Sequence, residues 1–153
     1  MPRTALILAG HGSHISPETA GIVWQQVDKL RQRHAADQLS AAFWKEAPSF
    51  RQVLGTLAAD DITIVPLFTA QGYFTQTVIP TEMQLGALTE HDGRTIRYGQ
   101  TLSEHPYLAR VVRQRIADAM QAHGVERENT AIVLIGHGTR RNPESRSATR
   151  AQA

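Results

Sequence analysis

The chain has 153 residues, of which 41% are hydrophobic and 20% are charged, a composition typical of a domain that buries one hydrophobic core. It contains no cysteine, which excludes disulfides, thiolate metal sites and cysteine nucleophiles and leaves histidine, carboxylates and tyrosine for chemistry. The sequence has no apolar run of membrane length and no signal segment, so we expect a cytoplasmic protein.

Positive charge is concentrated at the carboxyl end of the chain. Residues 139–153 carry a net charge of +3 and the whole chain carries +2, so residues 1–138 carry a net charge of −1. Neither a basic helix face nor an alternation of aromatic and basic residues is present in the sequence, so nucleic-acid binding is not expected. The arginines of this basic segment are Arg140, Arg141, Arg146 and Arg150. They are candidates for binding a polyanionic ligand. The alternative interpretation is that they lie on a solvated first turn of a helix.

Short apolar segments alternate with helical patterns along the chain, in the order β-α-β-α-β-α-β-α-β. We expect strands at residues 4–9, 39–43, 62–68, 95–98 and 131–135. We expect helices at residues 17–36, 48–59, 80–88 and 108–123. Strands that alternate with helices form a mainly parallel sheet through right-handed crossovers. The expected fold class is therefore α/β, a three-layer α/β/α fold whose ligand site lies at the carboxyl edge of the sheet.

Local signals mark where several of these elements begin and end. Ser16 is expected to cap the first helix, with Pro17 in its first turn, and Gly124 is expected to end the last helix. The continuous apolar segment 62–68 indicates a strand that is buried on both faces. Both tryptophans are expected in the core.

The segment Gly-His-Gly occurs twice, around His11 and His137, at an offset of 126 residues. An apolar strand pattern precedes each copy, which places one imidazole at the carboxyl end of each strand. We therefore expect residues 1–125 to form one domain, and residues 126–153 to be the first strand, loop and partial helix of a second, truncated repeat. The alternative is that the last strand completes the sheet of this domain or of a partner chain.

Several further motifs follow the first histidine in a specific order. They are Gly-His-Gly-Ser at the first strand, Phe43 with Glu46 and Pro48-Ser49, Val65-Pro66-Leu67-Phe68 with Gly72 and Ile79-Pro80, and Leu102 with His105-Pro106. With this set the whole chain resembles the class II tetrapyrrole chelatases of the sirohydrochlorin cobaltochelatase type, the CbiX-like enzymes, which are related in fold to ferrochelatase. The second Gly-His-Gly resembles the start of the second domain in the family's longer, two-domain members.

The resemblance implies a lyase that inserts a divalent metal into a sirohydrochlorin-type macrocycle in cobalamin or siroheme biosynthesis. Co²⁺ is the first expectation for the metal, with Ni²⁺, Fe²⁺ or Zn²⁺ as alternatives, and no organic cofactor is expected. Insertion removes two pyrrole N–H protons and requires a metal that is held loosely enough to be transferred, so one or two neutral imidazoles with water suit the site. His11 occupies this position and is the expected catalytic and metal-binding residue.

The chain departs from the small members of the family in the loop after the third strand. The resemblance places a second metal-binding histidine and an aspartate at positions that are Phe74 and Val78 here. Phenylalanine can neither bind a metal nor transfer a proton, so the family's metal ligands carry over for His11 alone.

Three explanations are open for the missing ligand. In the first, a second chelatase-like half or a homodimer partner supplies it, with His137 as the leading candidate. In the second, a nearby His14, Tyr73 or Gln71 takes its place. In the third, the domain is a non-catalytic metal- or tetrapyrrole-binding module that kept the fold. The expected metal ligands are therefore His11, His137 and His14.

The expected substrate-binding residues come from two loops and from the basic segment. Tyr73 and Phe74 are expected to form an apolar wall for a flat macrocycle. The full set is Gly12, Ser13, Gly72, Tyr73, Phe74, Thr75, Arg140 and Arg141. Phosphate-ester chemistry, a further class, is not favoured, because the first loop has no arginine and the chain has no phosphate cradle with a lysine.

Overall fold

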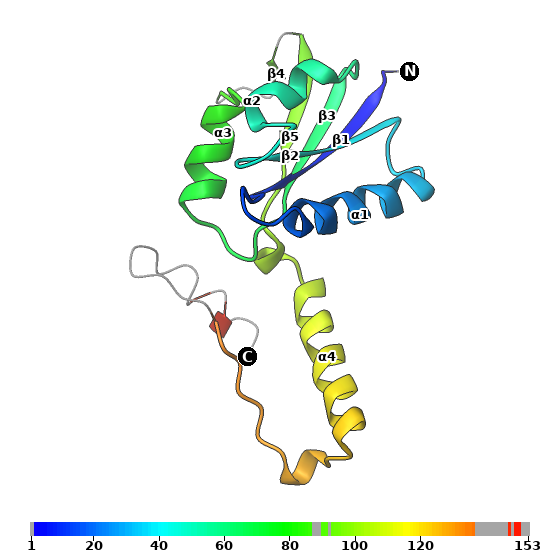
Figure 1. Cartoon of the computed structure of the whole chain (residues 1–153), viewed down its shortest axis with the longest axis vertical. Coiled ribbons are helices and arrows are strands. Elements are labelled where there is room, and N and C mark those ends of the chain that lie inside the picture. The colour runs from blue at the N-terminus through cyan, green and yellow to red at the C-terminus, as the bar shows by residue number, and fades with distance from the viewer. Residues whose placement is uncertain (1, 87–89, 92, 137–146, 148, 151–153) are drawn as a thin grey trace.

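The computed structural model describes residues 2–86, 90, 91, 93–136, 147, 149 and 150. The strands of this part of the chain form one sheet in the order β2-β1-β3-β5-β4 (Figure 1). Their bounds are β1 (Thr4–Gly10), β2 (Gln38–Phe43), β3 (Asp61–Pro66), β4 (Glu90–His91) and β5 (Arg94–Tyr98). Strand β1 is parallel to β2 and β3, strand β3 is parallel to β5, and only the short β4 is antiparallel. The predicted α/β fold with a mainly parallel sheet is confirmed.

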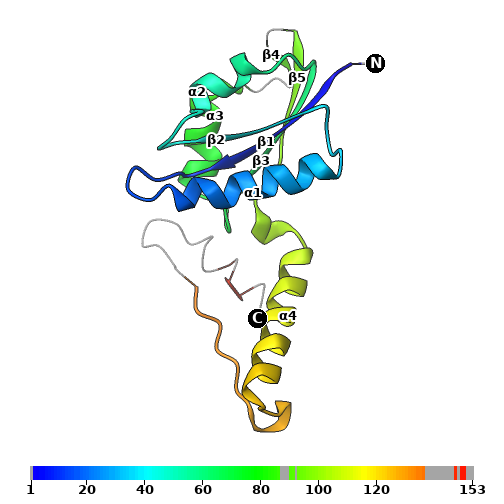
Figure 2. The ribbon, with the colours of Figure 1, turned by 45° about the vertical axis from the view of Figure 1, so that its right-hand side comes forward.

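Helices cover both faces of the sheet, which gives the predicted three layers (Figures 1 and 2). On one face, α1 (Glu18–Gln32) packs on β1 and β2 around Val23, Val27 and Phe43. On the other face lie α2 (Phe50–Val53), the 3₁₀ turn η1 (Leu54–Thr56) and α3 (Ile79–Glu82). The core on this side is the larger one and consists of Ala5, Ile7, Ala9, Ala42, Phe50, Val53, Leu54, Ala59, Ile62, Ile64, Ile79, Met83 and Ile96.

The first helix is shorter than predicted at both ends. It begins at Glu18, because the Ser16 hydroxyl donates to the Glu18 carboxylate instead of capping the helix. It ends at Gln32, since His34 adopts a left-handed backbone conformation with φ +52° that no α-helix can continue. The predicted end at residue 36 is therefore wrong.

The second helix and the third strand also differ from the prediction. Ser49 and Gln52 form a capping box that starts α2, but the helix tightens into η1, where Gly55 lowers the helix propensity. Strand β3 buries only alternate residues, Ile62, Ile64 and Pro66, while the residues between them are half-buried. The prediction that this strand is buried on both faces is wrong, because the helix layer on the α1 side does not cover β3 fully.

The long helix α4 (Tyr107–His123) projects away from the sheet in both views (Figures 1 and 2). Gly124 ends it in the left-handed conformation, as predicted, but none of its residues is buried. The predicted strand at residues 131–135 is absent: within the described residues this segment pairs with no strand, and Val133 and Ile135 are 79% and 92% exposed. Among the described residues, no helix has the length and apolar character needed to cross a membrane.

Candidate functional site

Two loops meet at the carboxyl edge of the sheet, one after β1 and one after β3. These strands are adjacent and parallel, so the chain leaves both at the same edge. The ring centroids of His11 and Phe74 lie 5.0 Å apart, with the rings inclined at 60°. The loop after β2 joins them, because the Lys45 amide donates to the His11 carbonyl at 3.1 Å. The loops after β1 and β3 therefore lie together at the carboxyl edge, as expected, and their joint role as a site stays a prediction.

The imidazole of His11 is exposed and is held by its own loop. Its Nδ1 lies 3.0 Å from the carbonyl oxygen of Gly12. A carbonyl oxygen can only accept, so Nδ1 carries the proton in this contact. In the neutral ring Nε2 then holds the lone pair, which is the form that binds a metal or accepts a proton.

The backbone of the histidine loop is fixed by Glu46. The Ser13 amide donates to Glu46 Oε1 at 2.5 Å. Gly12 has φ +67°, and a Cβ at this position would lie 3.0 Å from the Phe43 Cβ and 3.1 Å from Glu46 Oε1. Only glycine fits between these groups without strain. The Ser13 hydroxyl accepts from the amides of Ile15 and Ser16, so it stabilises the turn that leads to α1.

Four aromatic side chains form a cluster centred on Phe74, whose ring lies beside that of His11, and we call them the aromatic wall: Trp44, Phe68, Tyr73 and Phe74. Phe74 stacks on Phe68 with centroids 6.1 Å apart, and its contacts with Trp44 and Tyr73 at 6.0 Å and 6.3 Å are edge-to-face. Trp44 was predicted in the core, but it is 37% exposed because it follows the end of β2 and turns toward Phe74. Tyr73 is 70% exposed. Imidazole and apolar surface therefore lie side by side.

The loop after β3 continues into a π-helix, η2 (Phe74–Val78), so the helix predicted from residue 80 begins earlier. The Ile79 amide bonds to the carbonyl of Phe74, five residues back. Pro80 has no amide hydrogen with which to continue this pattern to Thr75. The Tyr98 hydroxyl donates to the Thr75 carbonyl instead, at 2.7 Å. Tyr98 of β5 therefore holds the loop that carries Phe74 in place.

Thr75, predicted to bind substrate, is only 3% exposed. Its hydroxyl lies 3.0 Å from the amide of Gly72 and donates to the carbonyl of Gly72 at 3.1 Å. Both contacts brace the turn, so the side chain serves the loop. A cavity of about 520 Å³ opens beside this turn between the ends of β3 and β5, with neutral amides and hydroxyls that include Gln76 and Tyr98 on its lining.

Of the predicted metal ligands other than His11, His14 alone lies within the described residues. His14 is exposed further along the same loop. Among the described residues, no three histidine, aspartate or glutamate side chains form a cluster that could hold a metal ion. His137, Arg140 and Arg141 lie outside the described residues. The sequence resemblance pointed to Glu46, but nothing in the sequence indicated its contact with Ser13.

We expect Tyr98→Phe to destabilise the fold by about 1–3 kcal/mol, because it leaves the buried Thr75 carbonyl without a donor. Burial raises the pKa of Tyr98 to about 12. A tyrosine whose pKa is higher in the folded than in the unfolded chain contributes stability that is fully present below the unfolded pKa. This contribution is lost as the pH rises toward 12. Urea unfolding measures the first effect. Absorbance titration of the phenols measures the second, and a highest-pKa component that persists in Tyr98→Phe would contradict the assignment.

Comparison with known proteins gives a consistent result. The CbiX family model matches residues 5–119. A protein of Halobacterium salinarum described as a probable sirohydrochlorin cobaltochelatase is 35% identical over 162 residues, which cover 94% of this chain and 55% of that protein. The chain thus spans about half the length of this relative.

Solved structures share the fold. A multi-domain protein of Deinococcus radiodurans with structural similarity to chelatases has a TM-score of 0.76 at 28% identity, over 99% of this chain and 35% of that one. The sirohydrochlorin chelatase SirB of Bacillus subtilis subspecies spizizenii, solved with cobalt, has a TM-score of 0.73 at 19% identity, over 99% of this chain and 60% of that one. The matched family model, the curated relative and the order of the motifs agree, and the chain belongs to the CbiX family of tetrapyrrole chelatases.

Proposed function

We propose that this chain is a chelatase unit that inserts a divalent metal into a sirohydrochlorin-type tetrapyrrole, with Co²⁺ as the leading candidate for the metal. The observation that carries the proposal is the exposed imidazole of His11, protonated on Nδ1, beside the aromatic wall at the carboxyl edge of the sheet. A flat macrocycle gains apolar contact from the wall, and its pyrrole nitrogens can then reach an imidazole nitrogen that carries a lone pair.

The reaction replaces two pyrrole N–H protons by the incoming metal. In the proposed mechanism His11 Nε2 accepts one proton, passes it to solvent and is then available for the second. The same nitrogen is the expected ligand for the incoming metal before transfer, and its lone pair becomes available to the pyrrole protons once the metal has passed to the macrocycle. A single imidazole with water holds a divalent ion weakly enough to release it, which a closed four-ligand site would not do.

Cobalt is the leading candidate for the metal for two reasons. The Halobacterium salinarum relative is described as a cobaltochelatase, and the SirB structure contains cobalt. Imidazole sites bind Ni²⁺, Cu²⁺ and Zn²⁺ by the general order of divalent affinities as well, so binding in vitro does not define the physiological metal. Ni²⁺, Fe²⁺ and Zn²⁺ are the alternatives. No organic cofactor is included in the proposal, and a cytoplasmic location stays a prediction.

The absence of a three-ligand cluster around His11 in the described residues supports a second unit as the source of the missing groups. That unit is a second chelatase-like half or a homodimer partner, with His137 as a candidate ligand and Arg140 and Arg141 as candidates for macrocycle carboxylates. Phe74, at the position of the second family histidine, supports a different function, a tetrapyrrole- or metal-binding module without turnover.

The test is anaerobic absorbance titration of the chain with sirohydrochlorin and Co²⁺. We expect a rate of cobalt insertion above that of the protein-free mixture, saturable in macrocycle. Saturable binding without faster insertion would support the binding module instead. A chain that neither binds the macrocycle nor accelerates insertion would reject both functions.

A further inference from the structure

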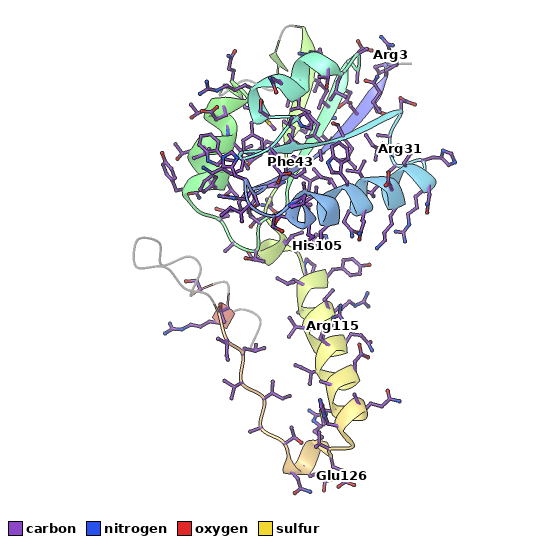
Figure 3. The ribbon with its side chains drawn as sticks, viewed as in Figure 1. Arg3, Arg31, Phe43, His105, Arg115 and Glu126 are labelled. Carbon is purple, nitrogen blue, oxygen red and sulfur yellow. The ribbon has the colours of Figure 1, made fainter. Side chains whose placement is uncertain are left out.

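The loop after β2 brings a lysine to the edge of the aromatic wall. Phe43, the last residue of β2, lies buried inside the domain (Figure 3), and the chain reaches the surface at Trp44 and Lys45. The loop is short, because the Phe43 amide donates to the Pro48 carbonyl at 2.9 Å. The Lys45 amide donates to the His11 carbonyl at 3.1 Å. The backbone of Lys45 is therefore held in a defined position beside the histidine loop.

The ammonium group of Lys45 lies over the ring of Trp44. Its Nζ is 5.9 Å from the ring centroid, which is within the range of a cation–π contact. The Trp44 ring is in turn 6.0 Å from that of Phe74, which lies 5.0 Å from the ring of His11. Lys45 is half-buried, as expected for a side chain whose stem covers apolar surface while its charge stays in water. Imidazole, apolar wall and cation therefore follow one another in this order.

The ammonium of Lys45 has no carboxylate partner within the described part of the chain. The ion pairs of the described residues join arginines to carboxylates and do not include Lys45. The adjacent carboxylate, Glu46, accepts the Ser13 amide at 2.5 Å instead. Lys45 thus presents a positive charge that an anionic ligand can pair with at the edge of the site.

We propose that Lys45 binds a peripheral carboxylate of the tetrapyrrole and so selects a macrocycle that carries carboxylates. The pyrrole nitrogens of such a macrocycle lie at its centre, and its carboxylates lie on its rim. When the macrocycle rests on the aromatic wall with its nitrogens toward His11, its rim extends past Trp44, where the ammonium lies. The inference rests on the proposed function, because it takes the macrocycle as the ligand, but it concerns binding and not insertion.

Anaerobic absorbance titration with metal-free sirohydrochlorin tests this role. Lys45→Gln should weaken macrocycle binding about threefold to fivefold at low salt, the effect expected from one partly exposed ion pair. The difference from the wild type should shrink as salt is added. Lys45→Arg keeps the charge and should bind like the wild type. Lys29→Gln is the matched control, since Lys29 lies exposed near the end of α1, and it should also bind like the wild type.

Labelling of the lysines gives a second measurement on the unmodified chain, which contains two lysines, Lys29 and Lys45. Bound sirohydrochlorin should slow the acylation of Lys45 severalfold and leave that of Lys29 unchanged, as measured by mass spectrometry. This measurement needs no substitution, so the proposal remains testable if a variant fails to fold.

Three results would overturn the role of Lys45. They are equal macrocycle affinity in Lys45→Gln and the wild type, an equal loss of affinity in Lys45→Gln and Lys45→Arg, and unchanged acylation of Lys45 in the complex. A wild-type chain that binds sirohydrochlorin through Lys45 but does not accelerate Co²⁺ insertion would reject the proposed insertion and support this inference. A wild-type chain that does not bind the macrocycle would reject both.

Discussion

His11→Ala is expected to lower the rate of metal insertion at least about 100-fold, the size of effect typical for loss of a group that transfers protons. The ring is exposed, and among the described residues its hydrogen bond is to Gly12 of its own loop, so its removal should leave the fold intact. Insertion rate and Co²⁺ affinity should fall together, because the same nitrogen is assigned to both. Circular dichroism of the variant checks the fold.

His123→Ala is the matched control, since this histidine lies exposed at the end of α4, in a helix that projects away from the sheet. It should insert metal like the wild type. A His11→Ala variant with unchanged insertion would remove His11 from the mechanism. An equal loss of insertion rate in His14→Ala would instead mean that two imidazoles of the same loop both take part in metal insertion.

Phe74→His is expected to strengthen Co²⁺ and Zn²⁺ binding by about tenfold or more. The ring at position 74 lies 5.0 Å from that of His11, centroid to centroid, and an imidazole binds these metals at about 2.0–2.1 Å, so two rings at this separation can share one ion. Competition with a chromophoric chelator measures the affinity. In the double variant Phe74→His/His11→Ala the gain in metal affinity should disappear, because it requires both rings.

Phe74→Leu separates metal binding from packing. It keeps an apolar side chain but removes the ring contacts with Phe68 and Trp44, so macrocycle affinity should fall while metal affinity stays as in the wild type. If Phe74→His bound metal no better than Phe74→Leu, position 74 would be too distant or wrongly oriented for a shared site. The missing ligand would then have to come from elsewhere.

The sheet and the meeting of its loops were predictable, because they follow from local patterns. Apolar strands that alternate with helices form parallel sheets, and parallel neighbours end at the same edge, so His11 and the loop carrying Phe74 had to come together.

The structural features that the sequence could not reveal depend on contacts with residues elsewhere in the chain. The segment 131–135 has the apolar pattern of a strand, yet a strand forms only beside another strand, and the described part of the chain places none next to it. Trp44 was expected inside because it is large and apolar, but its ring turns to Phe74 at the edge. The π-helix required knowing that Tyr98 would supply a donor to Thr75.

The contact between His11 Nδ1 and the Gly12 carbonyl has a consequence for turnover. The imidazole donates through Nδ1–H when neutral and also when Nε2 has taken up a proton, because the imidazolium ion keeps both N–H groups. The loop conformation that Glu46 fixes can therefore persist through uptake and release of each proton. Successive deprotonations would then proceed without a conformational step between them, and their pace would depend on how fast protons exchange with water.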